Sequence, residues 1–349
     1  MNAAIDTLPA RAPVAAPHST QKFKLLLKRE FWEHKGGFFW APLVAGGVFL
    51  LLTLMGLIMA EVAGRRVADQ NIKIDGEQIT IGALDLGKLT SKIGPEEMRQ
   101  VAGAVDLSLY TAAGWGLLVL AFVVFFYCLG SLYDDRKDRS VLFWKSLPLS
   151  DTQTVLSKVA SATVVAPVLA VVAGLITMLG FLVLASVFVM LHGGNPITLL
   201  WGPGSPLLIA ATMLAAVPVY ALWVLPTVGW LMFCSAWARS KPFLWALMVP
   251  VFAGIFVSWF DLMQLFDLET SWFWKNIVAR SLLSVMPGSW FDVASLGATD
   301  LDGPAAVHHL INLRSIYSVL GTAQLWLGVL AGAALIAASI RLRRWRDEG

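Results

Sequence analysis

The stretch of sequence that decides the fold covers residues 159–238 and reads VASATVVAPVLAVVAGLITMLGFLVLASVFVMLHGGNPITLLWGPGSPLLIAATMLAAVPVYALWVLPTVGWLMFCSAWA. None of these 80 residues is Asp, Glu, Lys or Arg. A helix needs about 20 mostly apolar residues to cross the hydrocarbon core of a bilayer, which is roughly 30 Å thick. Gly and Pro gather at 192–196 and 202–206, and that density ends a helix and marks a turn. We therefore predict two membrane-spanning helices here, at about 159–191 and 207–238.

Further uncharged stretches predict four more spanning helices, at about 38–60, 107–133, 242–260 and 315–340. The whole chain is 57% hydrophobic and 14% charged, whereas soluble domains are roughly 45–50% apolar and about 25% charged. This composition excludes a soluble globular enzyme. We expect an all-α integral membrane protein whose six transmembrane helices form one domain over 36–340. Three helices in the long uncharged stretch would also fit by length, but the charges of the loops favour two.

Lys and Arg in the loops predict the orientation of these helices. The segments predicted inside contain 17 of the 26 basic residues; they are 1–37, 134–158, 239–241 and 341–349. The segments predicted outside contain the other nine; they are 61–106, 192–206 and 261–314. Loops rich in Lys and Arg stay on the cytoplasmic side of a membrane. Both termini are therefore predicted to be cytoplasmic.

The N-terminal region is predicted to contain a helix that lies on the membrane surface. Residues 1–20 form a flexible cytosolic tail before it, and 341–349 form a second cytosolic tail at the other end of the chain. Within 21–35, one helical face carries the apolar residues and the basic residues lie largely elsewhere, which is typical of an interfacial helix. The apolar residues are Phe23, Leu26, Leu27 and Phe31, and the basic ones are Lys22, Lys24, Lys28 and Arg29. The alternative is an inward extension of the first span, but Gly36 and Gly37 favour a break.

The predicted spans lack the residues that chemistry inside a membrane requires. None of the six contains Asp, Glu, Lys or Arg. A charge at the membrane centre costs about 2.5–3.5 kcal/mol and usually marks a path for ions or protons. Its absence argues against a proton-coupled carrier, although neutral Ser, Thr and Asn side chains remain able to coordinate sodium. We expect no catalytic residues and, with a net charge of only +3, no nucleic-acid partner.

Two motifs that suggest ligand sites are better explained by chance. Residues 82–90, GALDLGKLT, resemble a phosphate-binding loop, but Leu89 follows Lys88 where that loop needs the hydroxyl that binds Mg²⁺. His308 and His309 are adjacent in a predicted outer loop, without a Cys or a carboxylate at ligand spacing. We therefore expect neither an ATP site nor a metal site in this chain.

The cytosolic segment 134–158 differs from the other predicted loops. Asp and Arg alternate at its start, and four apolar residues follow, from Val141 to Trp144. Contiguous exposed apolar residues usually mark a contact. The residues alone leave two places for them open, the lipid interface or a groove of another protein. Ser150 and Gln153 form the pattern of a capping box, which predicts that the third spanning helix starts there.

Three elements resemble the membrane-spanning subunits of ABC transporters of the ABC-2 type. They are Phe23–Trp32, the Asp/Arg-rich turn that leads into Ser146–Ser150, and Val155–Lys158. In that family a surface helix precedes the first of six spans, both termini are inside, and the loop between spans two and three carries the helix that contacts the ATPase. Met286–Trp290 resembles the family's Pro-containing segment before the last span. The outer segment 61–106 is longer than in the compact members of the family.

The resemblance implies that this chain is the permease subunit of an ATP-driven transporter, most simply an exporter of a hydrophobic or amphipathic substrate in a bacterial plasma (inner) membrane. It implies that ATP and Mg²⁺ bind to separate cytosolic ATPase subunits, so that this chain is not an enzyme and holds no cofactor. The expected partners are those subunits, a second permease subunit in a homo- or heterodimer, and membrane lipids. The residues expected to couple the loop to the ATPase are Arg136, Arg139, Leu142, Phe143, Trp144 and Leu147.

Gly321, Gly328 and Gly332 lie near one face of the last predicted span, and small residues let helices approach closely. Their neighbour is either a second subunit or a helix of the same chain. Two other functions stay open: a membrane-anchored accessory, immunity or assembly protein without transport, and a sodium- or lipid-linked carrier that works alone. The loop 134–158 discriminates between them, because only a transporter subunit requires it for binding an ATPase.

Overall fold

The computed structural model describes residues 19–68, 72–74, 77–79, 94–138, 150–263, 269–291 and 311–346. This part of the chain is helical apart from one small antiparallel hairpin of strands β1 (Ile72–Ile74) and β2 (Glu77–Ile79), in which Ile72 pairs with Ile79. Six of its helices are long and apolar enough to cross a membrane. The predicted fold class, an all-α protein with six membrane-spanning helices, is confirmed.

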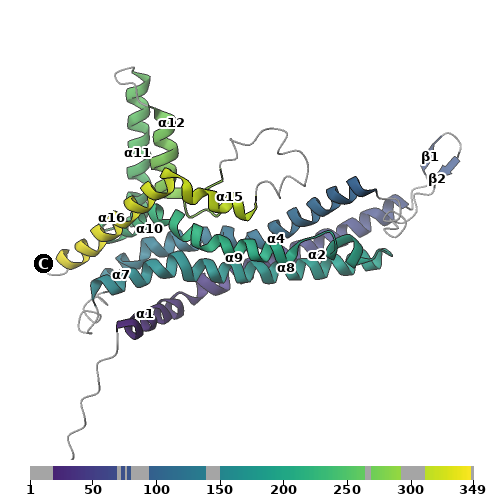
Figure 1. Ribbon diagram of the computed structural model, residues 1–349, viewed down its shortest axis with the longest axis horizontal. Helices are drawn as coiled ribbons and strands as arrows, with labels where there is room; N and C mark the ends of the chain where they lie inside the picture. Colours follow the sequence, from purple (N-terminus) through teal and green to yellow (C-terminus); the bar gives the residue numbers. More distant parts are fainter. Residues whose placement is uncertain are drawn as a thin grey trace, which may run out of the picture.

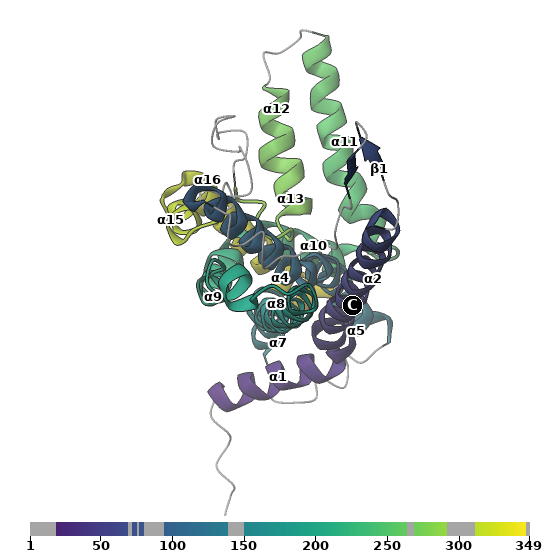
Figure 2. The ribbon, with the colours of Figure 1, turned by 90° about the vertical axis from the view of Figure 1, so that its right-hand side faces the viewer.

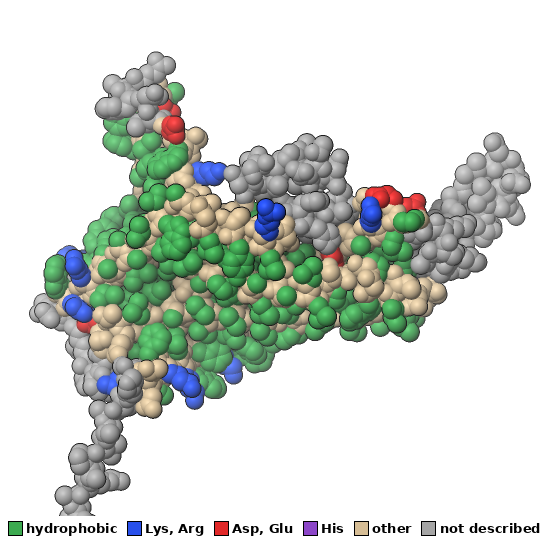
Figure 3. Space-filling model, in the orientation of Figure 1, with side chains coloured by type: hydrophobic (Ala, Val, Ile, Leu, Met, Phe, Trp, Pro, Cys, Tyr) green, Lys and Arg blue, Asp and Glu red, His purple; other side chains and the backbone are tan. Residues whose placement is uncertain are grey.

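Four long helical segments lie side by side along the longest axis of the molecule (Figure 1). They are α2 (Ala41–Ala68), α4 (Pro95–Ser131), α8 (Ala166–Leu191) and α9 (Pro206–Trp223). Helix α7 (Asp151–Ala160) and the π-helical turn η2 (Ser161–Val165) lead directly into α8, so that one helical segment runs from 151 to 191. Leu109, Met178 and Leu182 form part of the apolar core between α4 and α8. Figure 3 shows hydrophobic side chains covering the flank of this bundle, as a lipid-facing surface requires.

The N-terminal helix α1 (Ser19–Glu33) lies across the end of the bundle rather than along it (Figure 2). A turn at His34 and the π-helix η1 (Gly36–Trp40) separate α1 from α2. Leu26 is buried and Phe23, Leu27 and Phe31 are partly buried. The chain therefore changes direction close to the predicted break, and α1 is not a straight inward extension of the first span.

Several helices have bounds that differ from those of the predicted spans. Helix α4 begins twelve residues before the predicted start at 107. The predicted span 207–238 is two helices, α9 and α10 (Leu225–Trp237), because Pro226 has no backbone N–H and cannot continue the hydrogen-bond ladder. The predicted span 315–340 is also divided. Its first residues belong to α15 (Leu313–Ser318) and η8 (Val319–Gly321), and the long helix α16 covers Ala323–Arg346.

A helical hairpin projects from the side of the bundle. It consists of α11 (Pro242–Leu262) and a returning segment made of α12 (Thr270–Phe273), η4 (Trp274–Val278) and α13 (Ala279–Leu283). Trp274 donates its indole N–H to Ser258 Oγ at 2.9 Å, which joins the two arms. Helix α11 has the length and composition of the predicted fifth span, but it runs across the direction of α2, α4 and α8 (Figures 1 and 2).

Helices α10 and α16 pack closely because glycines face each other. A Cβ added to Gly332 would lie 2.5 Å from the backbone oxygen of Leu225, and one added to Gly229 would lie 2.6 Å from the oxygen of Gly332. A Cβ at Gly328 would lie 3.0 Å from Pro226 Cγ. Gly328 and Gly332 therefore contact a helix of the same chain, whereas a Cβ at Gly321 would meet nothing within 4 Å. Of the two neighbours considered for the predicted glycine face, Gly328 and Gly332 contact the helix of the same chain.

We expect Gly332→Leu to lower the free energy of unfolding by about 1–3 kcal/mol, which is the usual effect of overpacking. The reason is that the backbone of Leu225 cannot move away from a new side chain. The thermal unfolding temperature of the detergent-solubilised protein measures this effect. Gly321→Leu is the matched control and should leave that temperature nearly unchanged. Equal unfolding temperatures for the two variants would contradict the close packing of α10 on α16.

Candidate functional site

A buried ion pair joins α1 to α7 at the end of the bundle. Lys158 on α7 is 2% exposed, Glu30 on α1 is fully buried, and Lys158 Nζ lies 3.3 Å from Glu30 Oε1. The hydroxyl of Tyr127 on α4 donates to Glu30 Oε2 at 2.9 Å. A buried charge is tolerated only when it is paired and hydrogen-bonded. These contacts therefore fix α1, α4 and α7 relative to one another.

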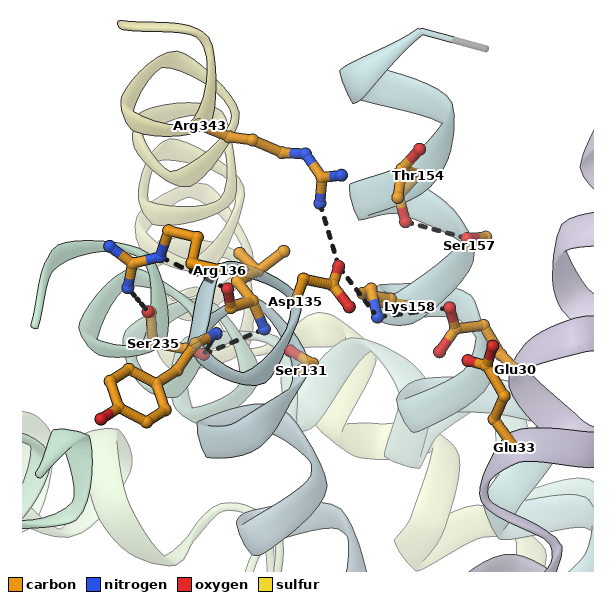
Figure 4. Close-up of polar contacts among 12 residues, drawn as sticks. Glu30, Glu33, Ser131, Asp135, Arg136, Thr154, Ser157, Lys158, Ser235 and Arg343 are labelled. Carbon is orange, nitrogen blue, oxygen red and sulfur yellow. Dashed lines mark hydrogen bonds and ion pairs between the residues drawn. The ribbon is translucent and has the colours of Figure 1, made fainter. Parts of the chain in front are cut away.

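The same lysine continues the network toward the last helix. Asp135, on the short helix α5 (Tyr133–Lys137), lies 3.5 Å from Lys158 Nζ and 3.3 Å from Arg343 Nη1. Arg343 on α16 also pairs through Nε with Asp151 at 3.1 Å, and it is 6% exposed. Figure 4 shows Asp135 between Arg343 and Lys158, with Glu30 on the far side of the lysine. Alternating charges thus run from α1 across α7 and α5 to α16; we call Glu30, Asp135, Asp151, Lys158 and Arg343 the ion network.

Members of the ion network lie on both sides of residues 139–149, the middle of the predicted coupling loop 134–158. Helix α5 ends at Lys137, just before residues 139–149, and α7 begins at Asp151, just after them. Ser150 Oγ accepts a hydrogen bond from the Gln153 N–H at 3.2 Å, and Gln153 Oε1 accepts one from the Ser150 N–H at 3.4 Å. The predicted capping box is confirmed. Asp135 on one side of the loop and Asp151 on the other bind the same arginine, Arg343.

Arg136 lies on a second link between this region and the bundle. Its guanidinium donates to the backbone carbonyls of Ser235 and Ala238, at the C-terminal end of α10. Ser235 Oγ in turn accepts the N–H groups of Leu132 and Tyr133 at 3.1 and 2.9 Å. A cation at a helix C-terminus interacts favourably with the carbonyls there. The predicted role of Arg136 toward an ATPase stays a prediction, and the other five predicted coupling residues lie outside the described residues: Arg139, Leu142, Phe143, Trp144 and Leu147.

The ion network was not predicted from the sequence. The spans were predicted from uncharged stretches, and the charged residues next to those stretches were assigned to loops. Lys158 directly precedes the predicted span 159–191, yet it lies inside the continuous helix 151–191 and is buried. Asp106 directly precedes the predicted span 107–133, is 1% exposed, and accepts the N–H of Ser205 at 2.7 Å. The helices therefore extend beyond the predicted spans and bury charged residues just outside them. One feature of the sequence did indicate a buried charge, because Glu30 lies on the apolar face of the predicted surface helix.

Glu30, Glu33 and His34 are close enough to hold a metal ion, because one ligand atom from each lies within 4.8 Å of the others. The carboxylates already have cationic partners, however. Arg29 Nη2 lies 2.8 Å from Glu30 Oε1, and Arg29 Nε lies 3.1 Å from Glu33 Oε1. With Lys158 also on Glu30, this cluster is better described as part of the ionic packing of α1 than as a metal site.

We expect Lys158→Met to lower the free energy of unfolding by on the order of 3 kcal/mol, because it leaves the buried carboxylate of Glu30 without its lysine. Adding Glu30→Gln should restore part of that loss, since no unpaired charge then remains at this position. Thermal unfolding of the single and double variants gives the coupling energy between the two sites. Arg99→Ala is the control, because its pair with Glu96 is exposed and should contribute little. Additive effects of Lys158→Met and Glu30→Gln would contradict the buried pair.

Comparisons with protein-family models, with curated proteins and with solved structures found no match to this chain. Six helices that are long and apolar enough to cross a membrane make it a multi-span integral membrane protein.

Proposed function

We propose that this chain is the permease subunit of an ATP-driven transporter of the ABC-2 type, and that a separate cytosolic ATPase subunit binds its loop 139–149. The observation that carries the proposal is the attachment of both ends of that loop to one buried ion network. Asp135 precedes the loop, Asp151 follows it, and both pair with Arg343 of the last helix. A loop that only joins two spans needs no such attachment to α1 and α16.

The helix that follows the loop is suited to carry a movement across the membrane. The segment 151–191 is 41 residues long, which at 1.5 Å per residue corresponds to about 60 Å. A hydrocarbon core of roughly 30 Å covers only half of that length. Its N-terminal part, with Lys158, therefore lies near the predicted inner side, and its C-terminal end reaches the predicted outer side. Displacement of α7 by a bound ATPase would shift the whole helix, and α1 and α16 would follow through Glu30 and Arg343.

The proposal includes the partners and ligands that the resemblance implies. ATP and Mg²⁺ would bind to the ATPase subunits, and this chain would supply the membrane pathway together with a second permease subunit, identical or related. The substrate would be hydrophobic or amphipathic and would be exported from a bacterial cell across its inner membrane. The many apolar side chains of the helices support a substrate of this class, and the exposed ones equally suit contact with lipid.

Trp144→Ala is expected to lower transport-coupled ATP hydrolysis several-fold without affecting membrane insertion, because a large aromatic anchor would be lost from the contact with the ATPase. The measurement is a tagged pull-down from native membranes in mild detergent, followed by mass spectrometry and an ATPase assay of the purified complex. Trp345→Ala is the matched control: this tryptophan is 73% exposed on α16, near the same end of the bundle but outside the loop.

A soluble P-loop protein that co-purifies with the wild type and is released by deletion of 138–147 would support the proposal. A chain that purifies alone or only with itself, without ATPase activity, would contradict it. The accessory, immunity or assembly function, or a carrier that works alone, would then be preferred.

Asp135→Asn tests the ion network as the path of coupling. The variant keeps the shape of the side chain but loses the charge that pairs with Lys158 and Arg343. The ATPase subunit should still co-purify, while the stimulation of ATP hydrolysis by substrate should fall several-fold. Glu96→Gln, which neutralises an exposed carboxylate on α4, is the control. Unchanged stimulation in the Asp135 variant would show that coupling does not pass through this carboxylate.

A further inference from the structure

A large apolar cavity lies beside α4, and none of its wall residues belongs to the ion network. Its volume is about 420 Å³, and its walls come from α4, α8, α9, the segment 287–291 and α15. Cavities of about 300–1,000 Å³ are the usual size of small-molecule sites. Representative wall residues are Gly114, Val171, Met213, Val217, Trp290 and Ile316.

The polar groups in the cavity wall are almost all used within the protein. Tyr220 donates its hydroxyl to the carbonyl of Val285 at 3.0 Å, and Thr212 donates its hydroxyl to the carbonyl of Leu208 at 2.8 Å. Tyr110 donates to the carbonyl of Ile311 at 3.4 Å. Water in a buried site needs two to four polar partners, and apolar cavities stay dry and take up apolar molecules. The wall therefore suits a hydrocarbon and does not suit an ion or a sugar.

One polar group in the wall lacks a partner. The indole nitrogen Nε1 of Trp290 is buried and has no acceptor among the residues that the structure describes. A buried donor without an acceptor is unfavourable, and native proteins rarely contain one. Because this nitrogen has no accessible surface, a molecule in the cavity does not touch it, and the wall that such a molecule contacts is apolar.

The cavity opens sideways along one stripe of α4. Thr111, Trp115 and Leu118 line it and are exposed, and their spacing places them on one face of the helix. Trp115 lies near the middle of α4 and is 37% exposed, and Leu118 is 47% exposed. Because the flank of a spanning helix faces lipid, the mouth of the cavity faces the interior of the bilayer and not the aqueous phase.

The backbone of α4 leaves space inside the cavity. Gly114 is one of the wall residues, and a Cβ added there would meet no atom within 4 Å. On the opposite side, Gly288 has φ of 81° and forms the turn that brings Trp290 and Phe291 into the wall. The space is therefore bounded by helices and by this turn, but side chains do not fill it.

We propose that this cavity binds a hydrocarbon chain of a bilayer lipid, which enters from the side along Trp115 and Leu118. The apolar wall favours a hydrocarbon chain, and the lateral mouth makes the membrane the source of that chain. This site goes beyond the proposed transport function, since it requires neither an ATPase nor a second subunit.

The test uses the full chain in lipid nanodiscs that contain a phospholipid with a photoreactive diazirine at mid-depth of its acyl chain. After irradiation, mass spectrometry quantifies labelling of the cavity-wall peptides of α4 and α9, relative to the exposed face of α2 in the same sample. We expect the wall to be labelled in the wild type, and Gly114→Phe to reduce that labelling at least five-fold. Gly56→Phe is the matched control, because a Cβ at this helical glycine of α2 also meets nothing within 4 Å, and it lies outside the cavity wall.

Ala216→Phe blocks the cavity from the α9 side and should give the same loss as Gly114→Phe, so the result does not depend on one variant. Wall labelling that is equal in the wild type and in both blocking variants would overturn the proposal. Labelling of the wall by a diazirine in the lipid headgroup, or by a soluble apolar probe added from the aqueous phase in preference to the lipid, would also overturn it.

Discussion

The pairing of Lys158 with Glu30 and Asp135 constrains the rest of the structure. An ammonium group that is 2% exposed requires carboxylates within hydrogen-bond reach, because transfer of an unpaired charge from water into protein is strongly unfavourable. The two carboxylates come from helices on either side of the first two spans, and Asp135 also holds Arg343 of the last helix. Lys158 therefore holds α1 and α5 directly, and α16 through Asp135, at one end of the bundle.

Two kinds of contact hold the helices together. Charged side chains hold the helices together where α1, α5, α7 and α16 meet, and close backbone approach holds α10 against α16 at Gly229 and Gly332. In a membrane, where water does not drive helices together, such close packing and internal polar contacts are the main sources of association. The cavity beside α4 is the exception, because its walls enclose space that no side chain fills.

One helical segment connects both proposals. Lys158 belongs to the ion network, and Pro167 and Val171, two to four turns further along the continuous helix, line the cavity. A movement of α7 imposed at loop 139–149 would reach the cavity wall through η2 and the start of α8. The proposed lipid site does not depend on transport activity. A transporter of the proposed kind would, however, change the shape of that site during its transport cycle.

The sequence by itself determined that the chain crosses a membrane with six apolar helices and that a helix starts at Ser150, because length, composition and capping are local properties. Only the tertiary structure decided which charges are buried, that α11 lies across the bundle, that Gly332 faces Leu225, and that a cavity remains beside Gly114. Periodicity could not place Lys158 or Asp106, since each directly precedes a predicted span. Glu30 lies 128 residues before Lys158, and Ser205 lies 99 residues after Asp106, so only packing of the helices brings these groups together.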